Sequence, residues 1–190
     1  MTGYLLLAAS PAPTNIGEVP EPGRTTVARP GSDPAAPPRP AGGSPPVALS
    51  IAGHLTGVPV EAVAADARGA LAVPQSPHRL GWWALGAAAG APGGTLLLAG
   101  HLDTVDEGVG VFESLHEVRP GTRAEVLAAD GTRHRYVIVA RRMYRQASLP
   151  KNLFTSGGTA RLALVTCGGR FTPESGRYEE NLVLYGVPRD

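Results

Sequence analysis

Short apolar runs, separated by turn-forming residues, dominate the chain after residue 46. Each run is about five to eight residues long and rich in Val, Leu, Ile or Tyr, which is typical of buried or half-buried strands. No segment keeps a helical period over three turns, since the alanine-rich stretch 84–91 is interrupted by Gly86 and Gly90. The runs that predict strands lie at 47–51, 58–65, 95–99, 123–127, 136–142, 161–166 and 181–187.

Turn signals between these runs indicate how the strands connect. Asp130-Gly131 lies between two of the runs, in the position of a type I′ hairpin turn. About seven or eight short strands with such signals between them are typical of a closed barrel or a sandwich. The pattern therefore predicts an all-β fold with one or two short helical turns.

The first 46 residues have a different composition. They hold eleven of the 19 prolines and too few large apolar side chains to offset the entropy of ordering the chain. We therefore expect a disordered Pro-rich leader at 1–46, extended and semi-stiff, before one folded domain at 47–190. The apolar stretch 4–9 lacks a basic residue before it, so two readings stay open: the remnant of a signal or anchor, and a frayed start.

Composition and charge exclude several classes of protein. The 17 basic and 16 acidic residues give a net charge of +1, so the chain has no electrostatic footprint for nucleic acid. No stretch reaches the roughly 20 apolar residues of a membrane helix. A single cysteine excludes an intramolecular disulfide and a Cys-x-x-Cys metal site.

That single cysteine, Cys167, follows an apolar run and precedes Gly168-Gly169. Most free cysteines act as small buried hydrophobes. Two adjacent glycines, however, leave room for another backbone to approach closely, which a merely packed cysteine does not need. The surroundings favour a reactive thiol at the C-terminal end of a strand.

Among the five histidines, His101 has a position like that of Cys167, next to a glycine at the end of an apolar run. It follows the apolar run 95–99 and Gly100, whereas the other four lie in polar or loop-like surroundings. Reactive side chains at the ends of two apolar strands would meet at one rim of a barrel. The hypothesis is a Cys167–His101 pair at that rim.

Such a pair needs a positive group near the thiol. At a pKa near 8.5 only a few per cent of a thiol is thiolate at about pH 7, and a neighbouring cation lowers that pKa. If the runs 161–166 and 181–187 pair antiparallel, we expect Arg177 near Cys167, where its guanidinium would hold a carbonyl or a developing oxyanion. From the residues alone, a solvated Arg177 paired with a nearby glutamate is an equal alternative.

Three motifs in this order resemble sortases, specifically the class F type of actinobacteria. Two further segments resemble the same class, and together the likeness spans 47–188, nearly the whole folded part. The motifs are LLLAGHLDT (96–104), LALVTCGGRF (162–171) and GRYEENLVLYG (176–186), with LAVPQSPHRLGWWALGAAAGAPGG (71–94) and VFESLHEVRPG (111–121) as the further segments.

The resemblance implies a closed eight-stranded sortase β-barrel and cysteine transpeptidation. Cys167 matches the family nucleophile, His101 the family histidine, and Arg177 is the best match to the class F arginine. The arginine of the better-known classes aligns with Asn181 of this chain. Arg170 is therefore the alternative to Arg177 as the functional arginine. Their TLXTC motif also reads differently, because alanine stands in its first position in this chain.

The implied reaction cleaves an LPXTG-type sorting signal between Thr and Gly through a thioester on Cys167, as a cysteine endopeptidase does, and transfers the protein to a cell-wall amine. His101 would protonate the leaving amine and later deprotonate the incoming one, while Arg177 would stabilise the oxyanion or position the signal. The resemblance implies chemistry that needs no metal and no cofactor, although some relatives use calcium as an activator. The family sits on the outer face of the cell membrane, facing the cell wall; a membrane tether is implied but is not visible in the sequence.

Two alternatives remain. One is another cysteine acyl-transfer enzyme, either a cysteine protease or an L,D-transpeptidase, although the latter carries a Ser-His-Gly-Cys stretch that Cys167 lacks. The other is a non-catalytic β-barrel binding module on a Pro-rich stalk. That module explains the strands and the leader, but it leaves the Gly-flanked cysteine and histidine without a reason.

Overall fold

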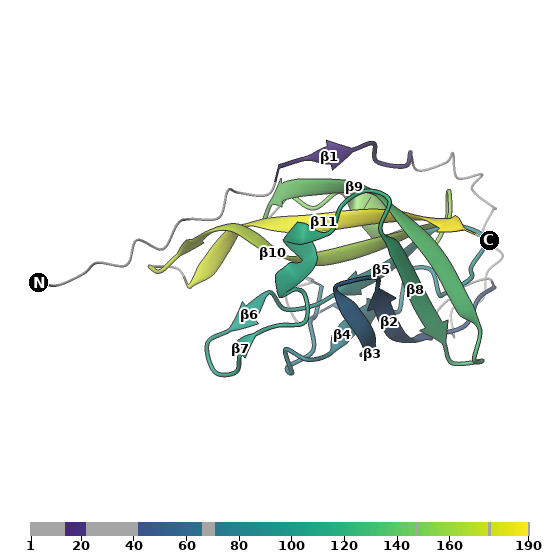
Figure 1. Ribbon diagram of the computed structural model, residues 1–190, viewed down its shortest axis with the longest axis horizontal. Helices are drawn as coiled ribbons and strands as arrows, with labels where there is room; N and C mark the ends of the chain where they lie inside the picture. The colour runs from purple at the N-terminus through teal and green to yellow at the C-terminus, as the bar shows by residue number, and fades with distance from the viewer. Residues whose placement is uncertain (1–13, 22–41, 66–70, 147, 175, 190) are drawn as a thin grey trace, which may run out of the picture.

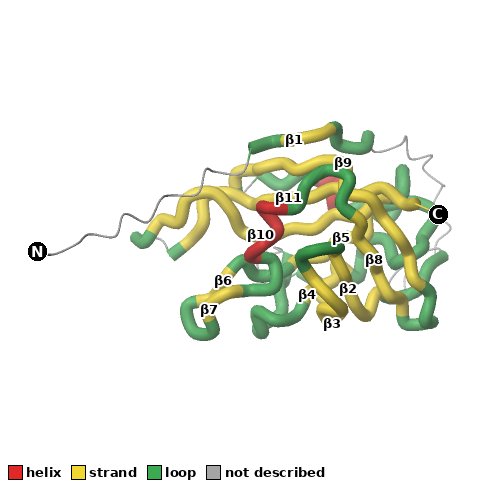
Figure 2. Tube along the Cα trace, in the orientation of Figure 1, coloured by secondary structure: helices red, strands yellow, loops and turns green. Residues whose placement is uncertain are grey.

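The computed structural model describes residues 14–21, 42–65, 71–146, 148–174 and 176–189. Strands make up most of these residues, and the helices among them are two short 3-10 helices, η1 (Glu113–Glu117) and η2 (Lys151–Phe154). Figure 2 shows how little of the chain is helical. The prediction of an all-β fold with one or two helical turns is confirmed.

Among the described residues, eight strands form the barrel and three strands of two residues each, β1 (Ile16–Gly17), β6 and β7, lie outside it. The small strands β6 (Asp103–Thr104) and β7 (Gly108–Val109) pair with each other just after His101. The barrel strands are β2 (Pro46–Ile51), β3 (Leu55–Val63), β4 (Leu80–Trp83), β5 (Thr95–Ala99), β8 (Arg123–Ala128), β9 (Arg133–Arg145), β10 (Arg161–Thr172) and β11 (Arg177–Arg189).

The barrel closes through β8 and β9 (Figure 1). The order around it is β9-β11-β10-β5-β4-β3-β2-β8. The pairs β3–β4 and β5–β10 are parallel, and the other neighbours are antiparallel. The eight-stranded barrel expected from the family resemblance is therefore present.

The barrel strand that the apolar pattern misses is β4. It has only four residues, Leu80–Trp83, and its second residue is glycine, so no run of apolar residues marks it. A Cβ atom on Gly81 would lie 2.9 Å from a methyl group of Val63 and 3.0 Å from Pro74, so close packing of β4 requires the glycine. Packing between neighbours thus decides this strand, and local sequence does not.

The hairpin between β8 and β9 differs from the predicted type I′ turn. A type I′ turn needs positive φ at both central residues, but Asp130 has a negative φ and only Gly131 is positive, at 84°. Gly131 N donates to Ala128 O at 2.9 Å, and Thr132 N donates to Asp130 Oδ1 at 2.9 Å. The position of the turn is right and its type is wrong, because the loop is one residue longer and the Asp130 carboxylate stabilises it.

Two apolar layers lie on opposite faces of the strands. One fills the barrel interior, and the other covers the outer face of β5, β9, β10 and β11. We call the second layer the outer apolar face; η2 packs on it through Leu153 and Phe154. Its buried members are Leu97, Ala140, Leu153, Ala163, Val165, Val183 and Tyr185.

Part of the leader is ordered, contrary to the expectation for residues 1–46. Strand β1 (Ile16–Gly17) pairs antiparallel with β9, beyond the point where β8 leaves it. Arg142 donates to Ile16 O at 2.8 Å and to Gly17 O at 2.7 Å, and the buried Arg161 donates to Pro20 O at 3.2 Å. Unpaired edge groups and buried guanidiniums need acceptors, which the segment's carbonyls supply. The rest of the leader, 1–13 and 22–41, lies outside the described residues.

A matched pair of glycine variants tests whether this segment stabilises the barrel. Gly17 and Gly53 have φ of 77° and 79°, so alanine is equally strained at both. A Cβ atom on Gly17 would lie 2.0 Å from Val139 O, whereas Gly53 has nothing within 4 Å. We expect Gly17→Ala to cost about 1–3 kcal/mol more than Gly53→Ala in thermal denaturation. Equal losses from the two variants would mean that this contact contributes nothing.

Candidate active site

Parallel pairing of β5 and β10 ends at Ala99 and Val165, but β10 continues to Thr172, so Cys167 lies within this strand and not at its C-terminal end as the apolar pattern predicted. Ala99 lies opposite Val165, an offset of 66 residues, and Gly100 N donates to Val165 O at 3.1 Å. His101 follows Ala99 by two residues and Cys167 follows Val165 by two, so both come just after the last paired positions of these neighbouring strands. The predicted cysteine and histidine therefore lie on the same side of the β5–β10 pairing, toward one end of the barrel.

The thiol lies on the outer side of β10. Side chains alternate along a strand, and Ala163 and Val165 both belong to the outer apolar face. Cys167 follows them at the same spacing and is half-buried. A layer of buried apolar side chains therefore leads up to the thiol on the outer side of β10.

The two glycines after Cys167 have a packing role. A Cβ atom on Gly168 would lie 2.9 Å from Met143 Cε, and one on Gly169 would lie 2.6 Å from Glu180 Oε2. Gly169 also has a positive φ of 73°, which glycine adopts without strain. These glycines let the side chains of Met143 on β9 and Glu180 on β11 pack against the strand beside the register shift that starts after Gly168. The space that they leave is therefore filled by this barrel's own side chains.

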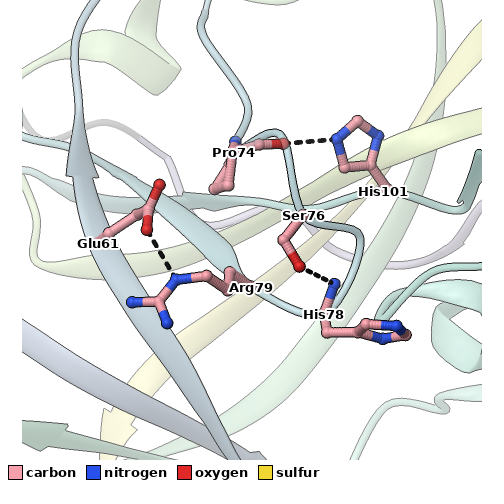
Figure 3. A network of polar contacts seen from close by, with 6 residues as sticks. All are labelled: Glu61, Pro74, Ser76, His78, Arg79 and His101. Atoms are coloured by element: carbon pink, nitrogen blue, oxygen red, sulfur yellow. Dashed lines mark hydrogen bonds and ion pairs between the residues drawn. The ribbon is translucent and has the colours of Figure 1, made fainter. Parts of the chain in front are cut away.

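His101 is held by the carbonyl of Pro74 (Figure 3). The distance from His101 Nε2 to Pro74 O is 2.7 Å. A carbonyl only accepts, so Nε2 carries the proton and Nδ1 is the free nitrogen of the neutral ring. Pro74 lies in the connection before β4, which Arg79 anchors to Glu61 of β3 at 2.7 Å. In the sequence, the feature that pointed to this region was the Val73-Pro74 pair in the segment 71–94.

The electrostatic surroundings of the thiol oppose its ionisation. Burial raises the pKa of Cys167, and the negative charge of Asp103 raises it further. Asp103 starts β6, two residues after His101, and Tyr178 of β11 donates to its Oδ2 at 2.6 Å. Burial and this bond to Asp103 raise the pKa of Tyr178 to about 12. Sequence reasoning missed both residues, although each lies inside a quoted motif.

Arg177 lies further from the thiol than expected. Asn181 is opposite Cys167, whereas Arg177 is opposite Thr172. Four residues of strand separate Arg177 from Asn181, or about 13 Å. The reason is that β10 and β11 continue beyond Cys167 as a long hairpin, so the turn beside Arg177 is displaced outward. Arg170 lies within the register shift between Gly168 and Phe171, and it is exposed.

Comparison with known proteins identifies the family. A family model described as the sortase domain matches residues 50–189. This chain belongs to the sortase family. A comparison with curated proteins gave no match.

Solved sortases share the fold of this sortase. Sortase A from Corynebacterium diphtheriae is 18% identical with a TM-score of 0.58, over 79% of this chain and 63% of that chain. Sortase C-1 from Actinomyces oris is 17% identical with a TM-score of 0.58, over 75% of this chain and 73% of that chain. Sortase C1 from Streptococcus agalactiae is 19% identical with a TM-score of 0.56, over 75% and 66%. At this identity the likeness concerns the fold.

Other features of this sortase lie away from the rim. Cavities of about 780 and 900 Å³ are lined by residues such as Arg123 and His116, and neither includes Cys167 or His101. No group of three or more His, Cys, Asp or Glu among the described residues is placed to hold a metal ion. Within the same ranges no helix is long and apolar enough to span a membrane.

Proposed function

We propose that this sortase is a cysteine transpeptidase that cleaves an LPXTG-type sorting signal between Thr and Gly and transfers the protein to an amine. The observation that carries the proposal is the parallel β5–β10 register, whose last pair, Ala99 and Val165, precedes His101 and the chain's only cysteine by two residues each. Membership of the sortase family supports the reaction class. Cys167 is the proposed nucleophile and His101 the proposed acid and base.

Acylation follows from these two groups. The Cys167 thiol passes its proton to His101 Nδ1, and the thiolate attacks the Thr carbonyl carbon. The imidazolium then gives that proton to the leaving Gly nitrogen as the C–N bond breaks, which leaves a thioester and a neutral imidazole. The bond from Nε2 to Pro74 O keeps the ring oriented through both proton transfers.

The outer apolar face fixes the strands that carry the site. Val165 and Ala163 precede Cys167 on the same side of β10, and Leu97 lies opposite Ala163 on β5. These three side chains are at most 5% exposed and are covered by η2 and its neighbours, so they hold the strands in place and leave no room for a peptide. The proposed peptide substrate is supported by membership of the sortase family.

The arginines have separable roles in the proposal. Arg177, opposite Thr172, is placed to position the sorting signal, whereas Arg170 is three residues after Cys167 and is the alternative for stabilising the oxyanion. We expect Arg177→Ala to raise KM for the peptide about tenfold with little change in kcat. Arg170→Ala is expected to lower kcat by about 10²–10³-fold if it holds the oxyanion. Steady-state cleavage of a fluorogenic peptide separates the two, and a fall in kcat for Arg177→Ala alone would reverse them.

The finer assignments rest on the quoted motifs. The segments around His101, Cys167 and Tyr178 support class F, and this class in turn supports an enzyme on the outer face of the membrane, with proteins that carry sorting signals and a cell-wall amine as its partners. The Pro-rich leader would then act as the spacer between a membrane tether and the barrel.

Trapping the acyl-enzyme tests the proposal. The protein is incubated with a panel of LPXTG-type peptides that differ at the third position, and the mass of the intact chain is measured. We expect an adduct of the N-terminal peptide fragment on Cys167. A chain that binds the peptides without an adduct would be a binding module, and adduct hydrolysis without any transfer to an added amine would indicate a cysteine protease.

A further inference from the structure

A carboxylate beside a nucleophilic thiol has a cost in the first half of the proposed reaction. Asp103 is the side chain whose charge acts on the Cys167 thiol, and its negative charge disfavours the thiolate. A neutral side chain at this position would make the cysteine a better nucleophile. The presence of this carboxylate is therefore explained only by a role in another step of the reaction.

Asp103 is also held in a fixed orientation. Tyr178, 75 residues further along the chain, donates to Oδ2 at 2.6 Å and so connects β6 to the β10–β11 hairpin. The Tyr178 ring packs against Phe171, with centroids 5.2 Å apart. Tyr178 occupies one oxygen, Asp103 forms no ion pair with any described residue, and the side chain is exposed. Oδ1 therefore has free lone pairs at the solvent side of the site.

The charge balance at the thiol changes once the thioester has formed. A thioester sulfur is neutral, so the repulsion between Asp103 and a thiolate disappears. What remains is a carboxylate that lies two residues after His101 and is held by Tyr178 of β11. The next reactant to approach that carbon is an amine, which is a cation at neutral pH.

We infer that Asp103, oriented by Tyr178, binds the ammonium group of the acceptor and positions it at the thioester. This inference rests on the proposed function and adds to it a site for a primary ammonium ligand. A carboxylate and an ammonium attract each other, and their hydrogen bond is charge-assisted. The oxygen of Tyr178 and the imidazole of His101 complete the polar surroundings of the attacking nitrogen.

The transfer step balances with these groups. The bound ammonium releases one proton to water, and the neutral amine attacks the thioester carbon. A second proton passes from that nitrogen to the neutral His101, and the C–S bond breaks with its electron pair on sulfur. The products are an amide, a thiolate and an imidazolium, and proton return from the imidazolium to the thiolate restores the starting enzyme.

Acceptors of different charge separate this role from a structural one. The acyl-enzyme formed from an LPXTG-type peptide is challenged with triglycine amide, which is cationic, and with hydroxylamine, which is uncharged at neutral pH. For Asp103→Asn we expect KM for triglycine amide to rise about tenfold. The KM for hydroxylamine and the kcat for both acceptors should stay within about twofold of the wild type. Tyr178→Phe should raise the same KM by less, because the carboxylate remains but loses its orientation.

Two controls sharpen the result. Asp106→Asn changes a carboxylate in the loop between β6 and β7 and should leave both KM values unchanged. The pH at half-maximal alkylation of Cys167 gives an independent readout. Removing the charge of Asp103 lowers the pKa of the thiol, so this midpoint should move to lower pH. The substitution leaves the other titratable and charged side chains of this region in place, namely His101, Arg170 and Glu180, which lies opposite Gly168.

Equal changes for the cationic and the neutral acceptor would overturn the inference, as would an unchanged KM for triglycine amide in Asp103→Asn. These results leave the proposed function intact, because the thioester still forms. If the wild type forms no thioester with any peptide of the panel, the proposed function fails and this inference fails with it.

Discussion

Cys167→Ala is expected to abolish both the adduct and the transfer of the sorting signal. No other thiol exists in the chain, so nothing replaces the nucleophile, and we expect a loss of at least about 10⁴-fold in turnover. The substitution removes only one sulfur atom from a half-buried position at the end of the outer apolar face, so the barrel should keep its stability within about 1 kcal/mol.

Peptide binding gives the control for Cys167→Ala. The substitution changes no other residue, so the variant should bind the sorting-signal peptide as tightly as the wild type in a fluorescence titration. Cleavage that persists in Cys167→Ala would contradict the assignment of the nucleophile. Loss of binding together with activity would mean that the substitution had damaged the fold.

His101→Ala is expected to slow acylation by about 10²–10⁴-fold, the usual contribution of a general acid and base. The thiol should still react with a large excess of iodoacetamide at alkaline pH, because alkylation needs the thiolate and not a proton donor for a leaving group. Single-turnover formation of the adduct measures the first effect, and the mass of the alkylated chain measures the second.

His78→Ala is the matched control for His101→Ala. His78 is exposed and lies in the connection before β4, close to Pro74 in sequence, but its ring has no hydrogen bond to His101 (Figure 3). We expect its acylation rate to stay within about twofold of the wild type. A comparable loss in His78→Ala would place the effect in the geometry of this connection and not in the imidazole of His101.

Local pattern predicted the parts of the fold that depend on near neighbours in the chain. The run at 95–99 matches β5 residue for residue, because a threonine followed by four apolar residues, all five of them buried, leaves little choice of structure. The pattern failed at β4 and β1, where the strand exists because a distant partner accepts it. Gly17 and Gly81 both fit against other segments so closely that a Cβ atom would clash, and no local rule records such a contact.

The candidate site divides in the same way. The Gly-flanked positions of Cys167 and His101 pointed to one rim, and the parallel register of β5 and β10 places them there. The placement of Arg177 failed because the length of the β10–β11 hairpin was underestimated. The run of strand residues continues to Thr172 through two glycines and a register shift, which the apolar pattern reads as a loop.

By itself, then, the sequence determined the strand-rich fold, the all-β class and the pair of residues at the rim, since apolar alternation and glycine positions act over a few residues. The tertiary structure decided which groups surround the thiol. Asp103 and Tyr178 meet across 75 residues, and Pro74 reaches His101 across 27. These contacts depend on strand register and on loop paths, which are set by packing of the whole barrel, and it is they that fix the charge and the orientation of the site.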